Sequence, residues 1–298
     1  MRARDYSRLP TERRHPRSRS LDQLSARQLA TLMNREDAAV LRAVKRAVPQ
    51  IAQAITRISD ALSRGGRLLF VGAGTSGRLG VIEAAECPPT FHTPPSLVQA
   101  VMAGGRSAVF RSREGAEDDR GAGAREIRRR ARRGDVVIGI AASGVTPFVG
   151  AALTAARRQG AETILVTCHP NTPIAARIRI ILPVGPELLT GSTRLKAGTA
   201  TKLALNMLTL GAMVRLGKTY GNLMVDVKPS SRKLRARAVT LVRTLTGWPD
   251  ARAARLLTRA GGRVKLTVLM ARAGLRRADA ARRLAKADGS LRTALGRR

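Results

Sequence analysis

Acidic side chains, aromatic rings and cysteines are all scarce in this sequence of 298 residues. The two cysteines, Cys87 and Cys168, are too few for a disulfide framework, and neither stands at a metal-ligand spacing from His15, His92 or His169. We therefore expect a reducing compartment and no metal site. No apolar run approaches the roughly 20 residues that span a bilayer, and no apolar stretch follows the charges at the N-terminus. These absences predict a cytoplasmic protein without membrane contact.

The shortage of acidic residues leaves a large positive charge. Lysine and arginine total 55 against 20 aspartate and glutamate residues, a formal net charge of +35. Such a charge is typical of nucleic-acid binding, but aromatic residues make up only 2% of the chain and cannot supply stacking platforms along a basic stripe. Most of the basic residues are arginines scattered outside the apolar segments. We interpret the charge as an arginine-biased solvated surface, and we favour this interpretation over nucleic-acid binding as the main function.

Hydrophobic periodicity predicts helices before residue 65 and an α/β fold after it. Residues 1–20 are polar and predict an extended arm, and Ser25 and Gln28 have the spacing of a capping box. Apolar residues then recur every three or four positions up to Gly65, with Pro49 marking a kink or a break between two helices. Short apolar segments separated by helical lengths follow, which indicates a parallel sheet flanked by helices. The expected strands cover 67–71, 97–103, 135–141, 162–168 and 178–184.

The remainder of the chain reads as helical. Residues 193–216 predict one long helix that is nearly apolar after residue 203, and therefore buried. Turn residues at 246–249, 261–262, 274 and 288–289 separate several short amphipathic helices. We expect three parts: an N-terminal arm with helices over 1–64, a sheet domain over 65–232, and a small helical domain over 233–298.

Two turns that follow predicted strands carry hydroxyl groups next to glycines. The first, GAGTSG, matches the dinucleotide-binding fingerprint, but the acidic residue that the fingerprint needs about 20 positions later is missing from CPPTFHTPPS. What remains is a helix N-terminus with Thr75 and Ser76, which suits a phosphate. The second turn places Ser143, Gly144 and Thr146 before a helix that begins at a proline. Helix capping and phosphate binding explain either turn alone equally well, and the pair favours a phosphorylated small molecule.

Carboxylates form two small clusters against the basic background. Glu83 and Glu86 lie on the helix after the first glycine turn, and the segment REGAEDD holds Glu114, Glu117, Asp118 and Asp119. Paired carboxylates can take a proton from a sugar and give one to a leaving oxygen. Negative charges also favour the first turns of helices and pair with nearby arginines, so the clusters alone leave both interpretations open.

Several blocks together resemble a known family. GAGTSGRLGVIEAAECPPTF, EGAEDD, GDVVIGIAASGVTPFV, PELLTGSTRLKAGTATKLALNML and GKTYGNLMVDV are similar, in this order, to N-acetylmuramic acid 6-phosphate etherases, which belong to the sugar isomerase (SIS) group of folds. The likeness runs from TERRHPRSRSLD to residue 228 and continues more loosely beyond it. The block PELLTGSTRLKAGTATK is shared with glucokinase regulatory proteins.

The resemblance implies a lyase that cleaves the lactyl ether of N-acetylmuramic acid 6-phosphate in cell-wall recycling, without metal or cofactor, as a homodimer. It implies that Glu86 protonates the departing lactate oxygen, with a pKa raised by partial burial, and that Glu117 serves proton transfer at C2 or ring opening. The residues implied to bind the sugar phosphate are Gly74, Thr75, Ser76, Gly77, Ser143, Gly144 and Thr146, with Arg194 and Lys196 adding charge, bridging subunits or lying on the surface.

Two positions depart from the family pattern. The SGRTP motif has Val145 in place of its arginine, and CNP after the fourth strand has His169 in place of its asparagine. The loss of a cation from the crevice leaves an alternative open, namely a non-catalytic sugar-phosphate sensor of the SIS type. A loop histidine is a ligand contact or a structural residue.

Overall fold

The computed structural model describes residues 9–227, 229 and 231–296. Contacts divide the chain into two compact units, one made of Met1–Ala84 and Ser96–Leu208, the other of Ala85–Pro95 and Thr209–Arg298. Two helices, α3 (Gly74–Phe91) and α7 (Lys196–Arg215), run across the boundary between the units. The three-part division drawn from the sequence stays a prediction.

The first unit contains a five-stranded sheet in which every pair of neighbours is parallel. Its strands are β1 (Leu68–Gly72), β2 (Val98–Met102), β3 (Val136–Ile140), β4 (Glu162–Thr167) and β5 (Ile178–Ile181), in the order β2-β1-β3-β4-β5. Central strands β1 and β3 are buried over their whole length, as expected for a sheet covered on both faces. The predicted α/β fold with five strands is confirmed.

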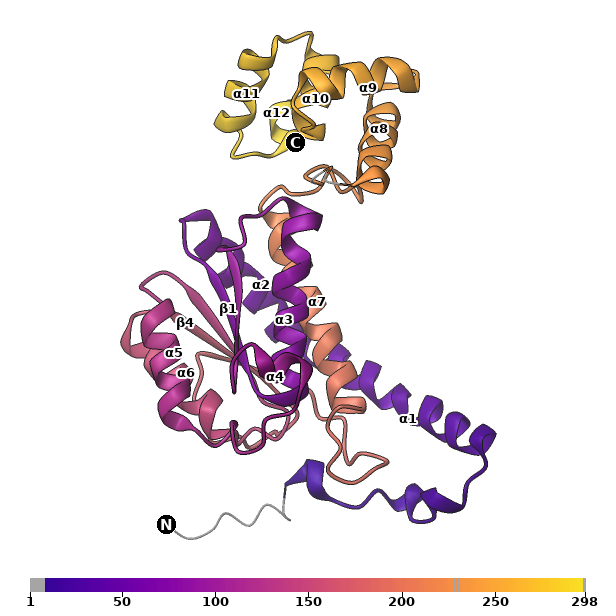
Figure 1. Ribbon diagram of the computed structural model, residues 1–298, viewed down its shortest axis with the longest axis vertical. Helices are drawn as coiled ribbons and strands as arrows, with labels where there is room; N and C mark the ends of the chain where they lie inside the picture. The colour runs from indigo at the N-terminus through magenta and orange to yellow at the C-terminus, as the bar shows by residue number, and fades with distance from the viewer. Residues whose placement is uncertain (1–8, 228, 230, 297–298) are drawn as a thin grey trace. The chain divides into compact units, whose positions relative to one another are not determined.

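Helices cover both faces of this sheet (Figure 1). On one face lie α5 (Arg120–Arg130) and α6 (Pro147–Arg158), whose apolar side chains pack on the β1, β3 and β4 residues Leu69, Val137 and Leu165. On the other face lie α2 (Val48–Ser63) and the first part of α3, where Gly80 packs closely against Phe70. The preceding helix α1 (Ala26–Arg46) begins with the predicted Ser25 and Gln28 capping box and ends before the break at Pro49.

A buried carboxylate ties the amino ends of β1 and β3 together. Asp135 is fully buried, and it accepts hydrogen bonds from the Arg67 backbone N–H at 2.9 Å and from Arg67 Nη2 at 2.7 Å. It also accepts one from the Arg132 N–H at 2.9 Å. A buried charge is tolerated only when it is paired and hydrogen-bonded in this way. Asp135 therefore holds the amino ends of β1 and β3 in place.

The topological switch point lies at the carboxyl ends of the strands, opposite the end that Asp135 stabilises. From β1 the chain crosses to β2 on one side, whereas β3 lies on the other side of β1. In open parallel sheets the crevice at such a reversal, beyond the carboxyl ends of the strands, is where ligands bind. Both hydroxyl-bearing turns begin here, because one follows β1 and the other follows β3.

The second unit is helical. It contains α8 (Arg232–Thr246), α9 (Asp250–Arg259), α10 (Val264–Ala273), α11 (Arg277–Lys286) and α12 (Leu291–Ala294), separated at the predicted turns. Its core includes Lys265, which is 4% exposed and donates to Asp226 Oδ2 at 2.5 Å and to the Gly289 carbonyl at 2.7 Å. Among the described residues, no helix is long and apolar enough to cross a membrane.

Candidate functional site

A cavity of about 260 Å³ opens at the switch point between β1 and β3. We call it the switch-point cavity. Segments from five parts of the first unit line it, namely the N-terminal arm, the turn after β1, the loop before α5, the turn after β3 and the loop before α7. Its lining consists of Leu9, Glu12, Ala73, Gly74, Thr75, Ser76, Glu117, Ile140, Ala142, Ser143, Val145, Thr146, Gly191 and Thr193. The four predicted hydroxyl residues therefore face one space, together with one of the two predicted catalytic glutamates.

The turn after β1 presents the N-terminus of α3 to the switch-point cavity. The N–H groups of Gly74, Thr75 and Ser76 precede the first hydrogen bond of the helix, which Gly77 donates to the Ala73 carbonyl at 3.1 Å. Gly77 does not line the cavity and its N–H is used within the turn, so its place among the phosphate-binding residues stays a prediction. Gly77 is needed for packing, since a side-chain carbon there would lie 2.3 Å from Met102 Sδ and 2.6 Å from the Gly72 carbonyl oxygen.

The turn after β3 places Ser143 and Thr146 before α6. Gly144 adopts a φ of 72°, and a side-chain carbon there would meet His169 Cβ at 2.6 Å, so only glycine fits. The Gly144 N–H donates to the Ala141 carbonyl at 2.9 Å and Gly144 does not line the cavity, so its place among the phosphate-binding residues likewise stays a prediction. His169 acts within the neighbouring loop, where its Nδ1 accepts from the Asn171 N–H at 3.0 Å.

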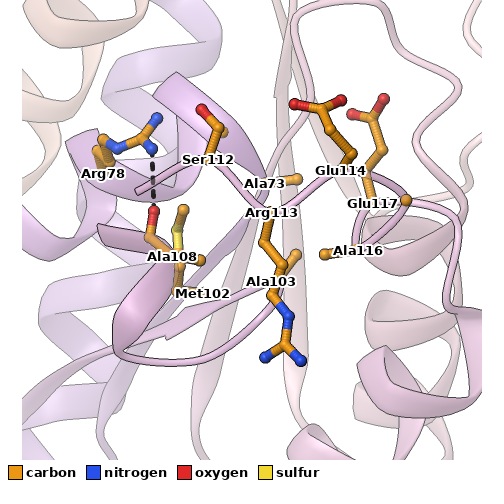
Figure 2. A pocket seen from close by; sticks show the side chains of 12 residues that line it. Ala73, Arg78, Met102, Ala103, Ala108, Ser112, Arg113, Glu114, Ala116 and Glu117 are labelled. Carbon is orange, nitrogen blue, oxygen red and sulfur yellow. Dashed lines mark hydrogen bonds between the residues drawn. The ribbon is translucent and has the colours of Figure 1, made fainter. Parts of the chain in front are cut away.

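Glu117 lies between two cavities. A second cavity of about 150 Å³ shares Ala73, Gly74 and Glu117 with the switch-point cavity and is further lined by Arg78, Ser112, Arg113 and Glu114. In Figure 2 the carboxylates of Glu114 and Glu117 point the same way, and the Arg113 side chain points away from them. The Glu117 carbonyl accepts from the Phe148 N–H at 2.9 Å, which fixes this loop to the start of α6.

The surroundings of Glu117 favour its protonated form. Partial burial in the cavity wall, and then the charges of Asp118 and Glu114, raise the pKa of the Glu117 carboxyl above its usual value. Although the residue remains solvent-accessible, its carboxyl is shifted toward the pH at which it can both accept and donate a proton. This property suits a group that shuttles protons.

We expect Glu114→Gln to lower the Glu117 pKa, because it removes a like charge. A raised carboxyl pKa adds stability below the unfolded-state pKa and loses it as the pH rises through the folded-state value. The variant should therefore be more stable than the parent protein at neutral pH and lose this advantage in acid. Carbon-13 titration of the Glu117 carboxyl and urea unfolding across pH measure both effects. Glu126→Gln, which removes a carboxylate bound to Arg129 and Arg130, is the control for the titration and should leave the Glu117 pKa unchanged.

The prediction that Glu86 is partly buried is wrong. The buried face of α3 carries Gly80, Glu83 and Cys87, and Glu86 lies a quarter turn away on an exposed face with Ala85 and Ile82. Glu86 lines neither the switch-point cavity nor the second cavity. Its neighbour Glu83 is only 6% exposed and accepts a hydrogen bond from Lys202 Nζ at 2.9 Å, which indicates a structural ion pair.

In the block GSTRLK, Gly191 and Thr193 line the switch-point cavity, whereas Arg194 and Lys196 do not. Arg194 is exposed; Lys196 is 3% exposed, and its Nζ lies 3.5 Å from Glu36 Oε2. The surface alternative considered for Lys196 is therefore wrong.

A buried carboxylate caps the N-terminus of helix α7 and holds the end of the preceding loop in place. Glu187 is fully buried and accepts hydrogen bonds from the N–H groups of Lys196 at 3.0 Å and Ala197 at 2.8 Å. Burial raises the pKa of the Glu187 carboxyl, and these hydrogen bonds oppose that shift. The loop between Glu187 and Lys196 carries Gly191 and Thr193 to the cavity, so this carboxylate helps to shape the cavity wall.

Comparison with known proteins gives a consistent result. The family model described as glucokinase regulatory protein N-terminal SIS domain matches residues 50–157, and the model described as SIS domain matches residues 121–211. An N-acetylmuramic acid 6-phosphate etherase from Synechocystis sp. is 51% identical over 290 residues, which cover 96% of this chain and 95% of that protein. One from Gloeobacter violaceus is 54% identical with 96% and 95% covered.

Among solved structures, a phosphoheptose isomerase from Francisella tularensis matches with a TM-score of 0.51 at 18% identity, covering 65% of this chain and 98% of that one. At this identity the likeness shows the fold alone. Together with the family models, it confirms the predicted SIS-type sheet.

Proposed function

This chain belongs to the family of N-acetylmuramic acid 6-phosphate etherases, and from that premise we propose how it acts on this sugar phosphate. It is a carbon–oxygen lyase that cleaves the D-lactyl ether of N-acetylmuramic acid 6-phosphate in the recycling of cell-wall amino sugars. The products are D-lactate and N-acetylglucosamine 6-phosphate. The observation that carries the proposal for the site is that two hydroxyl-bearing turns and Glu117 face one cavity at the switch point.

The phosphate is bound by the two turns. The hydroxyls of Thr75, Ser76, Ser143 and Thr146 surround the space in front of α3, whose first N–H groups are free of intrahelical partners. A helix N-terminus favours a phosphate through these N–H groups and through the helix dipole. Lysine and arginine are absent from the described lining of this cavity, so these neutral donors carry phosphate binding.

The reaction divides into an elimination and a hydration. Ring opening exposes an aldehyde, which acidifies the proton on C2, and Glu117 takes this proton as the base. The C3–O bond breaks, and the departing lactate oxygen receives a proton from Glu86, a role that rests on the family resemblance. Water then adds to the unsaturated aldehyde, its oxygen bonding to C3 and a proton returning to C2.

Incubation with N-acetylmuramic acid 6-phosphate tests the function directly. We expect stoichiometric D-lactate, and in heavy-oxygen water the label should enter N-acetylglucosamine 6-phosphate at C3 and be absent from the lactate. Label in the lactate would show displacement at the lactyl carbon and overturn the elimination. A folded preparation that the sugar phosphate stabilises against heat, but that releases no lactate, would establish the sensor alternative instead.

A valine, Val145, takes the place of an arginine in the wall of the switch-point cavity. It lines the switch-point cavity beside Ser143 and Thr146, where the family motif has arginine. Val145→Arg should lower KM about tenfold, because a guanidinium adds charge-assisted hydrogen bonds to the anionic substrate. KM for lactate release is measured at low and high salt, and the gain should shrink with salt. Val145→Gln has a long polar side chain without charge and is the control. Equal KM values for the two variants would contradict the prediction.

We also propose a cytoplasmic homodimer, from the family resemblance and from the absence of disulfide and membrane features in the sequence. On α7 the side chains of Leu210 and Val214 are 52% and 47% exposed, one turn apart. An exposed apolar pair of this kind fits a subunit contact. Light scattering coupled to size exclusion measures the mass directly, and a monomer of 31.9 kDa at working concentration would overturn the dimer.

A further inference from the structure

The switch-point cavity contains a carboxylate that the predicted site lacks. Glu12, in the short 3-10 turn Pro10–Glu12 of the N-terminal arm, lines the cavity together with Glu117. It is half-buried, and one of its oxygens accepts a hydrogen bond from Thr11 Oγ1 at 3.2 Å. The family likeness begins in the segment TERRHPRSRSLD, which contains Glu12, but no periodic pattern there assigns the residue a role, because its position depends on contacts with a loop about 180 residues later.

Hydrogen bonds hold the arm against that loop. The Gly191 N–H donates to the Thr11 carbonyl at 3.1 Å, and Ser18 Oγ donates to the Leu188 carbonyl at 2.7 Å. Thr11 is only 2% exposed. Gly191 has a φ of 78°, and a side-chain carbon there would lie 2.9 Å from Glu12 Oε2, so this glycine leaves the room that the carboxylate occupies.

Contacts among three buried or half-buried side chains hold the part of the arm that follows Glu12. His15 is 6% exposed, and its Nε2 lies 2.9 Å from Glu36 Oε2 on helix α1. The same carboxylate is 3.5 Å from the buried Lys196 Nζ at the start of α7. The histidine and the lysine both lower the pKa of Glu36, against an opposing effect of burial that is the largest single contribution. The arm is thus anchored on both sides of Glu12.

The negative charge of Glu12 decides which part of the substrate it can contact. A carboxylate repels the phosphate and the lactyl carboxylate of the substrate, but it accepts strong hydrogen bonds from hydroxyl groups. The phosphate is drawn to the α3 N-terminus, where Thr75 and Ser76 lie. A second carboxylate on the arm therefore suits the hydroxyl-bearing part of the same sugar.

We infer that Glu12 accepts hydrogen bonds from hydroxyl groups of the bound sugar and so determines specificity for a polyhydroxy phosphate. This inference rests on the proposed function, because it takes a sugar phosphate as the ligand. Glu12 would select a hexose phosphate over inorganic phosphate and orient C2 and C3 toward Glu117.

The test compares two ligands on the full-length protein. N-acetylglucosamine 6-phosphate and inorganic phosphate are titrated into the parent protein and Glu12→Gln, with binding followed by NMR. We expect Glu12→Gln to bind the sugar phosphate about tenfold more weakly. Its binding of inorganic phosphate should be equal or tighter, because a negative charge has gone. Asp22→Asn removes a charge from an exposed position two residues after the arm and is the matched control, with both affinities unchanged.

The outcomes separate the possibilities. Unchanged sugar-phosphate binding in Glu12→Gln would overturn the inference. Equal weakening of both ligands would also overturn it, because that result reports displacement of the arm rather than loss of a hydroxyl contact. Glu12→Asp, which keeps the charge on a shorter side chain, should fall between the parent and Glu12→Gln. Absence of lactate release from the parent protein would refute the proposed lyase, while these affinities would still decide the role of Glu12.

Discussion

Glu117→Gln lowers kcat for D-lactate release by about 10²- to 10⁴-fold, the range expected when a group that transfers a proton is removed. Glutamine keeps the shape of the side chain but can neither take the C2 proton nor return it. KM should change much less, because the hydroxyls and N–H groups that bind the phosphate come from other segments, the turns after β1 and β3. Initial rates of lactate formation at saturating substrate measure kcat.

A second readout identifies the step that is lost. In heavy water, the parent enzyme should exchange the C2 proton of N-acetylglucosamine 6-phosphate with solvent, and Glu117→Gln should not. Glu114→Gln is the comparison, since this neighbour lines the second cavity but not the switch-point cavity. It should retain activity within tenfold of the parent. Retention of exchange in Glu117→Gln would assign the base to another group.

Gly144→Ala should reduce both stability and substrate binding. A φ of 72° is strained for alanine, and the new methyl would meet His169 Cβ at 2.6 Å, Thr167 Oγ1 at 2.9 Å and Thr172 Cβ at 3.0 Å. Backbone strain and overpacking each cost about 1–3 kcal/mol, so we expect the free energy of unfolding to fall by about 2–6 kcal/mol. The turn that carries Ser143 and Thr146 must move to relieve the contacts, so KM rises as well.

A matched glycine separates these two effects. Gly65 has a φ of 82°, and nothing lies within 4 Å of the position that a side-chain carbon would take. Gly65→Ala should therefore show the backbone strain alone, a loss of about 1–3 kcal/mol in urea unfolding without change in KM. Similar losses for the two variants would show that the contacts around Gly144 relax at little cost.

The fold was predictable because its signals are local. Buried strands that are apolar throughout read directly from the sequence, and β4 begins at the predicted residue, Glu162. The hydroxyl-bearing turns were predictable for the same reason, since each directly follows a strand. Glu86 shows the limit of this reasoning. A rotation of the helix by a quarter turn decides whether such a residue is buried or exposed, and the few apolar residues around Cys87 did not define which face of the helix is buried.

Residues brought together over long distances in the sequence could not be predicted. Glu12 reaches the cavity only because Thr11 pairs with Gly191, and the N-terminal arm has no pattern that encodes this pairing. Lys196 gave no sign of burial either, because its partner Glu36 lies 160 residues earlier, on α1. The resemblance to a family supplied what local patterns could not, namely the reaction and the role proposed for Glu117 in it.

The buried Asp135 has a consequence for how this enzyme can change. It secures the amino ends of β1 and β3, whereas the two hydroxyl-bearing turns that line the switch-point cavity follow the carboxyl ends of the same two strands. The contacts that stabilise this pair of strands and the cavity proposed to bind the ligand thus lie at opposite ends of the strands. Selection, in nature or in the laboratory, can exchange residues such as Val145 at the carboxyl ends and alter the ligand while the clamp at Asp135 keeps the strands in register.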